Sequence, residues 1–371
     1  MGVGLTSGTP RTDVAGEPSR GAHGYLPDPV AATLEQAYDV GRWLSRERLS
    51  EGTTNLSLLV RTASGAYVLR RSREKKSPEE IAFELRLIEH LRAHGYPAPR
   101  LVRTRGGDGY LEHEGALYLM TGFIPGDVYD RHDPRHLHAA GRALGRYHRI
   151  VRGLPAPHYR RPAPSLTGLA APAETSFPEV ARAAGGLLPR DERERLEHHL
   201  ALIRDHVARV ERAMTAVYPT LDSLVIHGSF GPTALIFTGG EVVGVLDYDR
   251  ATRELRALDL AYTLRALCRT RRSAEGRSWT GLDSQLCRTF LAGYREVERL
   301  PAAEVAAMPL VLRGHGLLMV LKKCHNFLVK YAQAPQGLKD GRKLATVVEL
   351  EVIRARWLEE HGDELCAALP G

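Results

Sequence analysis

Cysteine and lysine are both scarce in this chain, and each shortage narrows what the protein can be. The four cysteines lie far apart and form no Cys-x-x-Cys pair, so neither a zinc site nor a disulfide framework is predicted, and buried free thiols are expected. Only seven of the 51 basic residues are lysine. The excess of arginine, in an alanine-rich chain, is more typical of a compositional bias than of a binding surface.

Long apolar segments are also missing. No apolar run approaches the roughly 18 residues that a membrane helix needs, and the N-terminus has no signal-like apolar block. A net charge of +7 would attract phosphates, acidic peptides or nucleic acid, but no basic run is interleaved with aromatic residues as in a nucleic-acid-binding surface. We therefore expect a cytoplasmic protein that binds neither a membrane nor nucleic acid.

The length of 371 residues predicts about two domains. Residues 1–30 are rich in Gly, Pro, Thr, Ser and Arg without periodicity, which predicts a disordered tail. Residues 31–125 are expected to form a β-rich N-lobe, and residues 126–371 a mainly helical C-lobe. A second irregular segment is predicted from Gly153 to about Pro189, with six prolines before Pro189 itself.

The N-lobe begins with a predicted hairpin and one strong helix. Apolar strands at residues 56–60 and 66–70 flank a turn at Ala63-Ser64-Gly65. Ser77, Pro78 and Glu80 form a capping box, which predicts a helix that continues to about Leu91 and stops at Gly95. Glu84 lies on the apolar face of this helix, so it either meets a cation or a donor, or it reaches water from the edge of the face.

A strand over residues 116–122 leads into a Gly/Pro hinge at Phe123-Ile124-Pro125-Gly126. From about His136 onward the pattern is helical, most clearly at residues 140–148 and 190–214. Short strands are expected only around residues 224–247. A β-rich lobe, a hinge and a helical lobe predict a bilobal α+β fold.

Two short segments carry most of the chemistry. The first contains His227-Gly228-Ser229 and Ala234, and the second follows an apolar strand with Asp247-Tyr248-Asp249. Further motifs occur in a fixed order: Gly52-Thr53-Thr54-Asn55, the strand ending in Arg70, Glu84, the hinge, and Asp259-Leu260-Ala261. This ordered series over residues 35–335 resembles the aminoglycoside phosphotransferase-like family, which includes choline kinases and type II homoserine kinases.

The resemblance implies a protein-kinase-like fold that binds ATP and Mg²⁺. The turn formed by Gly52, Thr53, Thr54 and Asn55 would approach the phosphates with its backbone amides. Arg70 stands where the family has a lysine that touches the phosphates, and Glu84 is its expected partner; a purely structural ion pair is the alternative. Phe123 and Ile124 complete the expected nucleotide-binding residues.

The resemblance also assigns roles around the loop. Asp247 matches the family's metal-binding carboxylate, and Asp249 could share the metal, contact the substrate or act as the base. Asp259 matches a carboxylate that braces the loop. His227, Ser229 and Asp249 form the candidate catalytic set, in which His227 is a scaffold residue rather than a base.

Two positions depart from the family pattern. Ser229 replaces the aspartate that accepts the proton of the acceptor hydroxyl, and a neutral hydroxyl cannot do so. Ala234 replaces an asparagine, which weakens or removes a second metal site. Losing a positioned base typically costs ~10²–10⁴ in rate, although phosphoryl transfer depends mainly on positioning and charge stabilisation.

Two functions therefore stay open. The first is an ATP-dependent phosphotransferase that acts on a hydroxyl of a small molecule or peptide, including Ser or Thr of a natural-product precursor peptide. The second is a pseudokinase that binds or activates a partner enzyme in a biosynthetic complex. The basic helix at residues 314–323 is either a solvated face over a core or the lining of a cleft for an acidic substrate or peptide.

Overall fold

The computed structural model describes residues 26–49, 55–72, 76–155, 165–270, 279–333 and 337–368. The chain divides into two compact units, one formed by residues 1–76 and 101–123 and the other by residues 77–100 and 124–371. The division falls between Phe123 and Ile124, inside the predicted hinge. Leu26 and Val30 are buried, so the described end of the segment expected to be a tail is part of a core.

The first unit is built on an antiparallel sheet. Its strands follow the order β1-β2-β3-β6-β4, with β5 paired to β6. Their bounds are β1 Trp43–Arg48, β2 Asn55–Thr62, β3 Gly65–Ser72, β4 Leu101–Val102, β5 Leu111–His113 and β6 Ala116–Gly122. The predicted hairpin is confirmed, because β2 and β3 pair in continuous register from Asn55 opposite Ser72 to Thr62 opposite Gly65.

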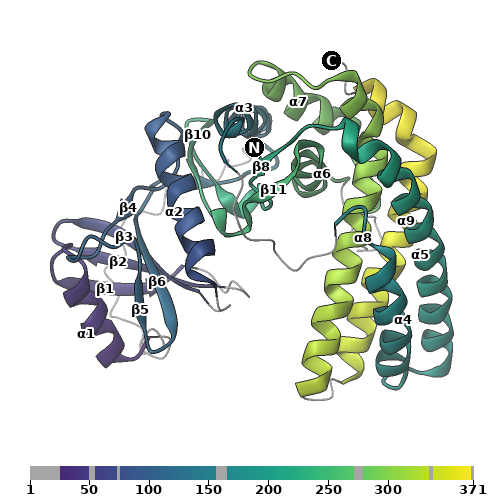
Figure 1. Cartoon of the computed structure of the whole chain (residues 1–371), viewed down its shortest axis with the longest axis horizontal. Coiled ribbons are helices and arrows are strands. Elements are labelled where there is room, and N and C mark those ends of the chain that lie inside the picture. Colours follow the sequence, from purple (N-terminus) through teal and green to yellow (C-terminus); the bar gives the residue numbers. More distant parts are fainter. Residues whose placement is uncertain are drawn as a thin grey trace, which may run out of the picture. The chain divides into compact units, whose positions relative to one another are not determined.

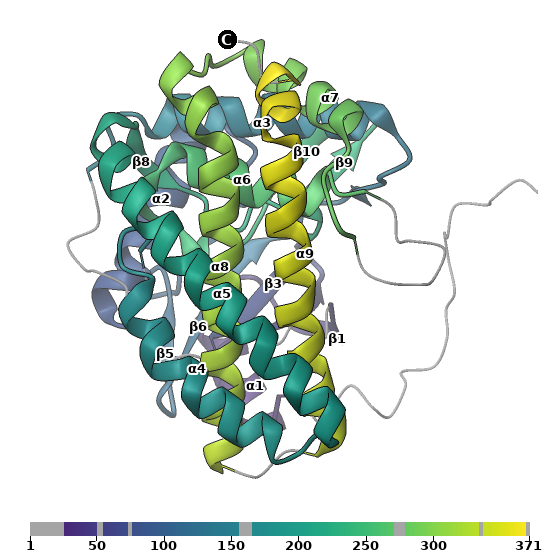
Figure 2. The ribbon, with the colours of Figure 1, turned by 90° about the vertical axis from the view of Figure 1, so that its right-hand side faces the viewer.

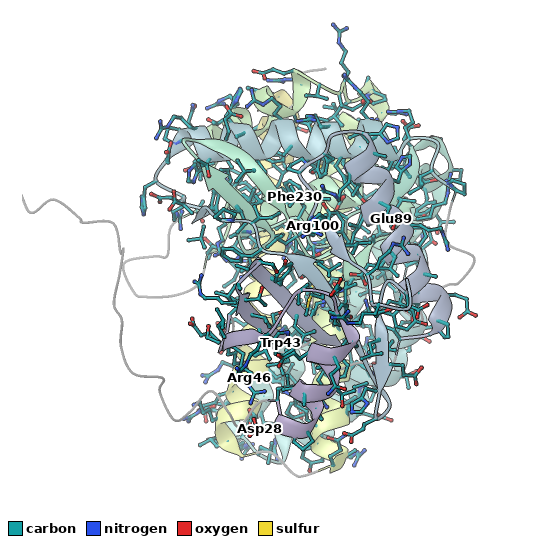
Figure 3. The ribbon with its side chains drawn as sticks, turned by 90° about the vertical axis from the view of Figure 1, so that its left-hand side faces the viewer. Asp28, Trp43, Arg46, Glu89, Arg100 and Phe230 are labelled. Atoms are coloured by element: carbon teal, nitrogen blue, oxygen red, sulfur yellow. The ribbon has the colours of Figure 1, made fainter. Side chains whose placement is uncertain are left out.

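Helix α1, Asp28–Ala37, packs on this sheet (Figure 1). Leu34 of α1 and the following Tyr38 belong to the same apolar core as Leu58, Val60 and Leu69. The Tyr38 hydroxyl donates a hydrogen bond to the carbonyl of Tyr118 at 3.0 Å. Asp28 of α1 also pairs with Arg46 of β1 (Figure 3). The first unit therefore has its own core and its own polar ties.

Helix α2, Pro78–Ala93, forms as its sequence predicts. The Ser77 hydroxyl accepts a hydrogen bond from the Glu80 amide at 3.2 Å, and the Glu80 carboxylate accepts one from the Ser77 amide at 2.9 Å. The chain leaves the helix at Gly95, which has φ +68°. One feature differs from the expected N-lobe of residues 31–125, since the contacts of α2 group it with the second unit.

The second unit contains two small sheets. One has the order β10-β9-β7, with bounds β7 Asp127–Val128, β9 Leu235–Thr238 and β10 Glu241–Val245. The other pairs β8, Ser223–Ile226, with β11, Thr252–Leu255. Strands β8, β9 and β10 lie in the region around residues 224–247 where short strands were predicted, whereas β7 and β11 lie outside it. The segments between these strands carry the site described below.

Helices make up the rest of the second unit. They are α3 Pro134–Val151, α4 Ala170–Gly185, α5 Arg190–Val217, α6 Arg256–Leu267, α7 Ser284–Arg295, α8 Ala302–Gln333 and α9 Leu338–Ala368. Figure 2 shows the long helices α5, α8 and α9 side by side, with α4 packed against them. Helices α4, α5, α8 and α9 thus pack against one another.

Helix α4 corrects the prediction of an irregular segment over residues 153–189. Pro172 lies in the first turn of α4, where its missing amide hydrogen costs no intrahelical bond. Pro178 lies inside the helix and removes one bond. Ala173, Phe177 and Val180 are buried at helical spacing, so tertiary packing outweighs the proline that the sequence interpretation treated as a breaker.

Helix α8 is long and apolar enough to cross a membrane by length and composition. However, 61% of its most apolar window is buried inside the protein, as in a core helix of a globular domain. Within residues 314–323, Gly314 to Leu317 are buried while Lys323 is exposed. Lys322 is half-buried, and the choice between a solvated face and the lining of a cleft stays a prediction.

Candidate functional site

The loop His227-Gly228-Ser229 follows β8 and is fixed by one buried carboxylate. Asp259 of α6 accepts a hydrogen bond from the His227 amide at 2.7 Å and one from the Gly228 amide at 2.9 Å. Both oxygens of Asp259 are thus directed at the backbone of the loop. The bracing role that the sequence resemblance implied for Asp259 matches this geometry.

Asp259 is itself held by a chain of buried polar groups. Nε2 of His148 on α3 lies 3.2 Å from Oδ2 of Asp259, and Nδ1 of His148 lies 2.8 Å from the Tyr294 hydroxyl of α7. Burial alone would raise the pKa of Asp259, but the His148 hydrogen bond and charge, with the His227 amide, outweigh it and lower that pKa. Asp259 is therefore an anion that ties α3, α6 and the loop together. The sequence interpretation missed His148 and Tyr294.

The ring of His227 is fully buried and engaged at both nitrogens. Nε2 lies 3.0 Å from the carbonyl of Leu246, so Nε2 carries the proton and donates it. Nδ1 then accepts from the amide of Ser229, at 3.3 Å. Burial lowers the pKa of His227, which keeps the ring neutral. The geometry matches the expected scaffold role, because His227 connects the loop to the end of β10.

Gly228 is required by the shape of this loop. Its φ is +74°, in the left-handed region that other residues rarely adopt. A β-carbon at this position would also lie 2.7 Å from the carbonyl oxygen of Arg250. The tight turn lets Asp259 reach two successive amides.

Ser229 and Ala234 are integrated into the same framework. The Ser229 hydroxyl donates to the carbonyl of Asp247 at 3.0 Å, and its side chain is 9% exposed. The carbonyl of Ala234 accepts a hydrogen bond from the Leu246 amide at 2.8 Å, and the methyl group is buried. Ser229 thus joins the loop to the strand that bears Asp247, whereas Ala234 offers no side-chain oxygen to a metal.

The two aspartates that follow β10 have different surroundings. Asp247 adopts the left-handed conformation with φ +69°, and its side chain is exposed. Such conformations in non-glycine residues concentrate at functional sites. Asp249 lies in the turn Tyr248–Arg250 and is 8% exposed. Its charge raises the pKa of His227 against the larger effect of burial, which places the Asp249 carboxylate near the buried ring.

A divalent cation would have few protein ligands here. Among the described residues, no group of three or more His, Cys, Asp or Glu side chains could hold a metal ion. Mg²⁺ is usually bound in proteins through one or two carboxylates together with substrate phosphates and water. The exposed carboxylate of Asp247, with Asp249 two residues later, fits that donor set.

The nucleotide-binding residues predicted from sequence are only partly described. Gly52, Thr53 and Thr54 lie outside the described residues, and Asn55 is described only as the first position of β2. Arg70 is half-buried on β3, opposite Leu119 of β6. Glu84 is 3% exposed, so the alternative in which it reaches water is wrong. Arg70 and Glu84 belong to different units, and their ion pair stays a prediction.

The hinge residues lie at the division between the units. Phe123 belongs to the first unit, where its amide donates to the carbonyl of Ala66 at 3.0 Å. Ile124 belongs to the second unit and packs against Gly244 of β10. Their contact with a nucleotide stays a prediction.

Two helical residues lie close to the loop but were not singled out from the sequence. The ring of Tyr262, on α6, lies next to Gly231, two residues after Ser229. His315, on α8, meets that ring edge-on, with 5.6 Å between ring centroids. The only signal in the sequence was Gly314-His315-Gly316, since two glycines inside a helix are unfavourable without a packing reason.

Taken as a whole, the second unit presents a loop braced by a buried carboxylate and an exposed aspartate after the next hairpin. These are the parts that define a kinase-like phosphotransferase. Residues 45–300 match the model of the phosphotransferase enzyme family, and the chain belongs to that family. The predicted family resemblance, the α+β kinase-like fold and the class of enzyme, a phosphotransferase with an alcohol group as acceptor, are confirmed at this level.

Individual relatives agree with this assignment. A homoserine kinase of Methylobacterium sp. (strain 4-46) is 30% identical over 335 residues, which cover 86% of this chain and 94% of the relative. An amicoumacin kinase in complex with AMP-PNP and Ca²⁺ superposes with a TM-score of 0.62 at 16% identity, over 88% of this chain and 94% of that one. A microcompartment-associated aminopropanol kinase gives 0.60 at 16% identity, over 92% and 99%. The two solved structures share the fold.

Proposed function

We propose that this protein transfers the γ-phosphate of ATP to the hydroxyl group of a small hydroxyl-bearing amino acid. The observation that supports this most directly is the anchoring of the loop by Asp259, at 2.7 and 2.9 Å, in front of the exposed Asp247. Phosphoryl transfer relies mainly on positioning and charge stabilisation. A loop held in place beside an exposed carboxylate is the arrangement that this chemistry needs.

Each candidate residue has a role in this proposal. Asp247 holds Mg²⁺, which when bound neutralises charge on the phosphate oxygens. The turn of Gly52, Thr53, Thr54 and Asn55, together with Arg70, Glu84, Phe123 and Ile124, holds ATP. Asp249 takes the proton of the acceptor hydroxyl, since the neutral hydroxyl of Ser229 cannot. His227 and Ser229 hold the loop in place beside Asp247.

The proposed class of acceptor is taken from a protein of similar sequence. The relative at 30% identity is a homoserine kinase, and homoserine is a small amino acid whose side chain ends in a primary hydroxyl. We extend this class of acceptor to the present chain. Serine and threonine residues of a precursor peptide offer the same functional group and therefore belong in the same experiment.

A pseudokinase is the competing function, and two observations favour it. Ser229 offers no base, and the buried methyl group of Ala234 offers no metal ligand. In that case the chain would bind a nucleotide or a partner enzyme without turnover. Measuring nucleotide binding and phosphoryl transfer separately distinguishes the two functions.

The test is incubation of the full chain with Mg-ATP and L-homoserine, free serine or threonine, or a Ser/Thr peptide. ADP release and phosphorylated product are both measured, the latter by mass spectrometry. Asp247→Ala should lower turnover by about 10²-fold or more, because several kcal/mol of charge stabilisation would be lost. Asp205→Ala, at an exposed position of α5, is the matched control and should leave turnover unchanged.

The results separate the alternatives clearly. Turnover that survives Asp247→Ala would overturn the proposed role of Asp247. Tight binding of Mg-ATP without any product from these acceptors would favour the pseudokinase. Asp249→Asn should abolish the acidic limb of the pH–rate profile if Asp249 accepts the proton, because the base is active only when deprotonated, whereas a purely structural role would lower stability and leave the shape of the profile intact.

A further inference from the structure

A second polar centre lies inside the helical core, between α6, α8 and α9. It consists of Tyr262 and Arg265 on α6, His315 and Gly316 on α8, and Glu351 on α9. Arg265 and Glu351 are both buried and form a bidentate pair, with N–O distances of 3.1 and 2.7 Å. Buried ion pairs contribute little net stability to a core, so their presence calls for another reason.

His315 has an unsatisfied ring nitrogen at this centre. The residue is 8% exposed, and its Nδ1 atom has no hydrogen-bond partner among the residues that the structure describes. Leaving a buried donor or acceptor unpaired is unfavourable, because the group has lost its hydrogen bonds to water. A ligand group that reached this nitrogen would remove that cost on binding.

The helix that bears His315 is shaped around the ion pair. A β-carbon on Gly316 would lie 1.7 Å from Oε1 of Glu351. Glycine inside a helix costs roughly 1 kcal/mol relative to alanine, and here it admits the Glu351 carboxylate against the backbone of α8. Nη1 of Arg265 also donates to the carbonyl of Leu312, at 3.3 Å. The ion pair is therefore held against α8 at Gly316, the residue that follows His315 in sequence.

Tyr262 connects this centre to the loop of the candidate site. Its ring packs edge-on against His315 on one side and lies next to Gly231 on the other. Burial raises the pKa of Tyr262, the Arg250 guanidinium opposes this effect, and the carboxylates of Asp247 and Asp259 add to it. The ring of Tyr262 therefore links His315 to the segment that follows Ser229.

The charge around His315 indicates which ligand group fits. Burial and the guanidinium of Arg265 lower the pKa of His315 to about 3, against a smaller opposite effect of Asp259. The ring therefore stays neutral. A neutral imidazole can donate its hydrogen to a carboxylate, whereas a cationic ammonium would lie close to the Arg265 guanidinium and has no lone pair to accept that hydrogen.

We infer that Tyr262 and His315 line the acceptor subsite, and that His315 selects acceptors carrying a carboxylate over the corresponding amines that lack one. This inference rests on the proposed function, since it assigns the far end of the same acceptor. The hydroxyl lies toward Ser229 and Asp247, Tyr262 covers the middle, and the carboxylate lies at His315. An acceptor that lacks the carboxylate leaves Nδ1 unpaired.

The test uses two acceptors that differ only in this group. L-Homoserine without its carboxylate is 3-aminopropan-1-ol. Binding of each to the full chain is measured by calorimetry, with and without the non-hydrolysable nucleotide AMP-PNP and Mg²⁺, and turnover with Mg-ATP is measured alongside. We expect the wild-type chain to bind homoserine at least about 10-fold more tightly, corresponding to 1.4 kcal/mol or more.

Variants of His315 make the test specific. His315→Ala should remove the preference for homoserine over 3-aminopropan-1-ol. It should weaken homoserine binding and raise the KM for homoserine, while kcat changes less. His315→Gln keeps a hydrogen-bond donor and should restore part of the preference. His325→Ala, on the exposed face of the same helix, should behave as wild type, and circular dichroism checks that each variant is folded.

Three results would overturn the inference: equal or tighter binding of 3-aminopropan-1-ol, binding of neither acceptor, or a homoserine preference that His315→Ala leaves unchanged. The failure of the proposed function looks different. If Mg-ATP binds and an acceptor is phosphorylated in an Asp247-dependent manner but without a carboxylate preference, only the role of His315 is wrong. If no acceptor is phosphorylated while His315-dependent homoserine binding remains, only the catalytic proposal is wrong.

Discussion

At the scale of single residues, the question is what Ser229 does in a position where the family carries a base. Its hydroxyl has one hydrogen, and that hydrogen is donated to the carbonyl of Asp247 at 3.0 Å. A hydroxyl used in this way holds the loop and the strand end together. It leaves the proton-accepting role to another group.

Ser229→Ala tests this interpretation. We expect the free energy of unfolding to fall by about 1 kcal/mol, the typical net contribution of one hydrogen bond. Turnover should change by only a few-fold, because no base is removed. Chemical denaturation and steady-state kinetics measure the two effects, and a loss of 10² or more in kcat with unchanged stability would show instead that Ser229 takes part in proton transfer.

The motifs around the loop correspond to contacts in the folded chain, while the roles predicted for the site residues stay predictions. Gly228 needs its positive φ, and Asp259 accepts hydrogen bonds from two successive amides of the loop. His148, Tyr294 and His315 lie on helices far from the loop in sequence, and each acts through a contact that only the folded chain creates. No local pattern could have assigned them.

At the scale of secondary-structure elements, the start of α2 agrees with the sequence prediction, whereas the interior of α4 does not. The capping box of α2 is present with both of its hydrogen bonds. In contrast, the interior proline of α4 led to the wrong prediction, because burial of Phe177 and its neighbours stabilises a helix that local propensity disfavours. Local hydrogen bonds are visible in the sequence, whereas tertiary burial is not.

Removal of the α2 cap should have a measurable cost. Ser77→Ala deletes the side-chain acceptor of the Glu80 amide, and N-cap deletions typically cost about 1 kcal/mol. We expect a loss of that size in urea denaturation with an unchanged m-value. Thr175→Ala, at an exposed interior position of α4, is the control and should change stability by less than about 0.5 kcal/mol.

Two glycines in the C-terminal helices should respond in opposite directions to the same substitution. Gly316→Ala would push a methyl group into Oε1 of Glu351, 1.7 Å away, and should cost about 3 kcal/mol or more by strain and by disturbing the buried ion pair. At Gly362 of α9, the nearest atom would be the Pro309 side chain at 3.4 Å. Gly362→Ala should therefore be neutral or stabilising by up to about 1 kcal/mol, and equal effects in thermal denaturation would contradict the assigned packing.

At the scale of the whole molecule, composition and motif order predicted the α+β kinase-like architecture, but they did not predict how α2 groups with the rest of the chain. The sequence interpretation assigned residues 31–125 to one lobe, whereas the contacts of α2 place it with the second unit. Sequence order alone cannot show this, because a helix inserted between two strands can pack on either side of a division. The polar centre around His315 could not be predicted from the sequence for a related reason, because α6, α8 and α9 come together only in the folded unit.

Buried histidines give the whole molecule a predictable dependence of stability on pH. In the unfolded chain a histidine takes up a proton near pH 6.5, whereas burial and Arg265 hold the pKa of His315 at about 3 in the folded chain. Between these values the unfolded state binds more protons, so stability is complete above pH 6.5 and is lost as the pH falls toward 3. Each pH unit within this range costs roughly 1.4 kcal/mol for a fully shifted group.

His315→Gln removes this one titration while His206 and His227, whose pKa values burial also lowers, remain in both proteins. Between pH 6 and pH 5 the wild-type chain should therefore lose about 1 kcal/mol more stability than the variant. Urea denaturation at a series of pH values measures the difference, and His325→Gln, at an exposed position, should run parallel to the wild type. Parallel curves for His315→Gln would mean that His315 is protonated as easily in the folded chain as in the unfolded one. The neutral imidazole on which the selection of a carboxylate depends would then predominate only above about pH 6.5.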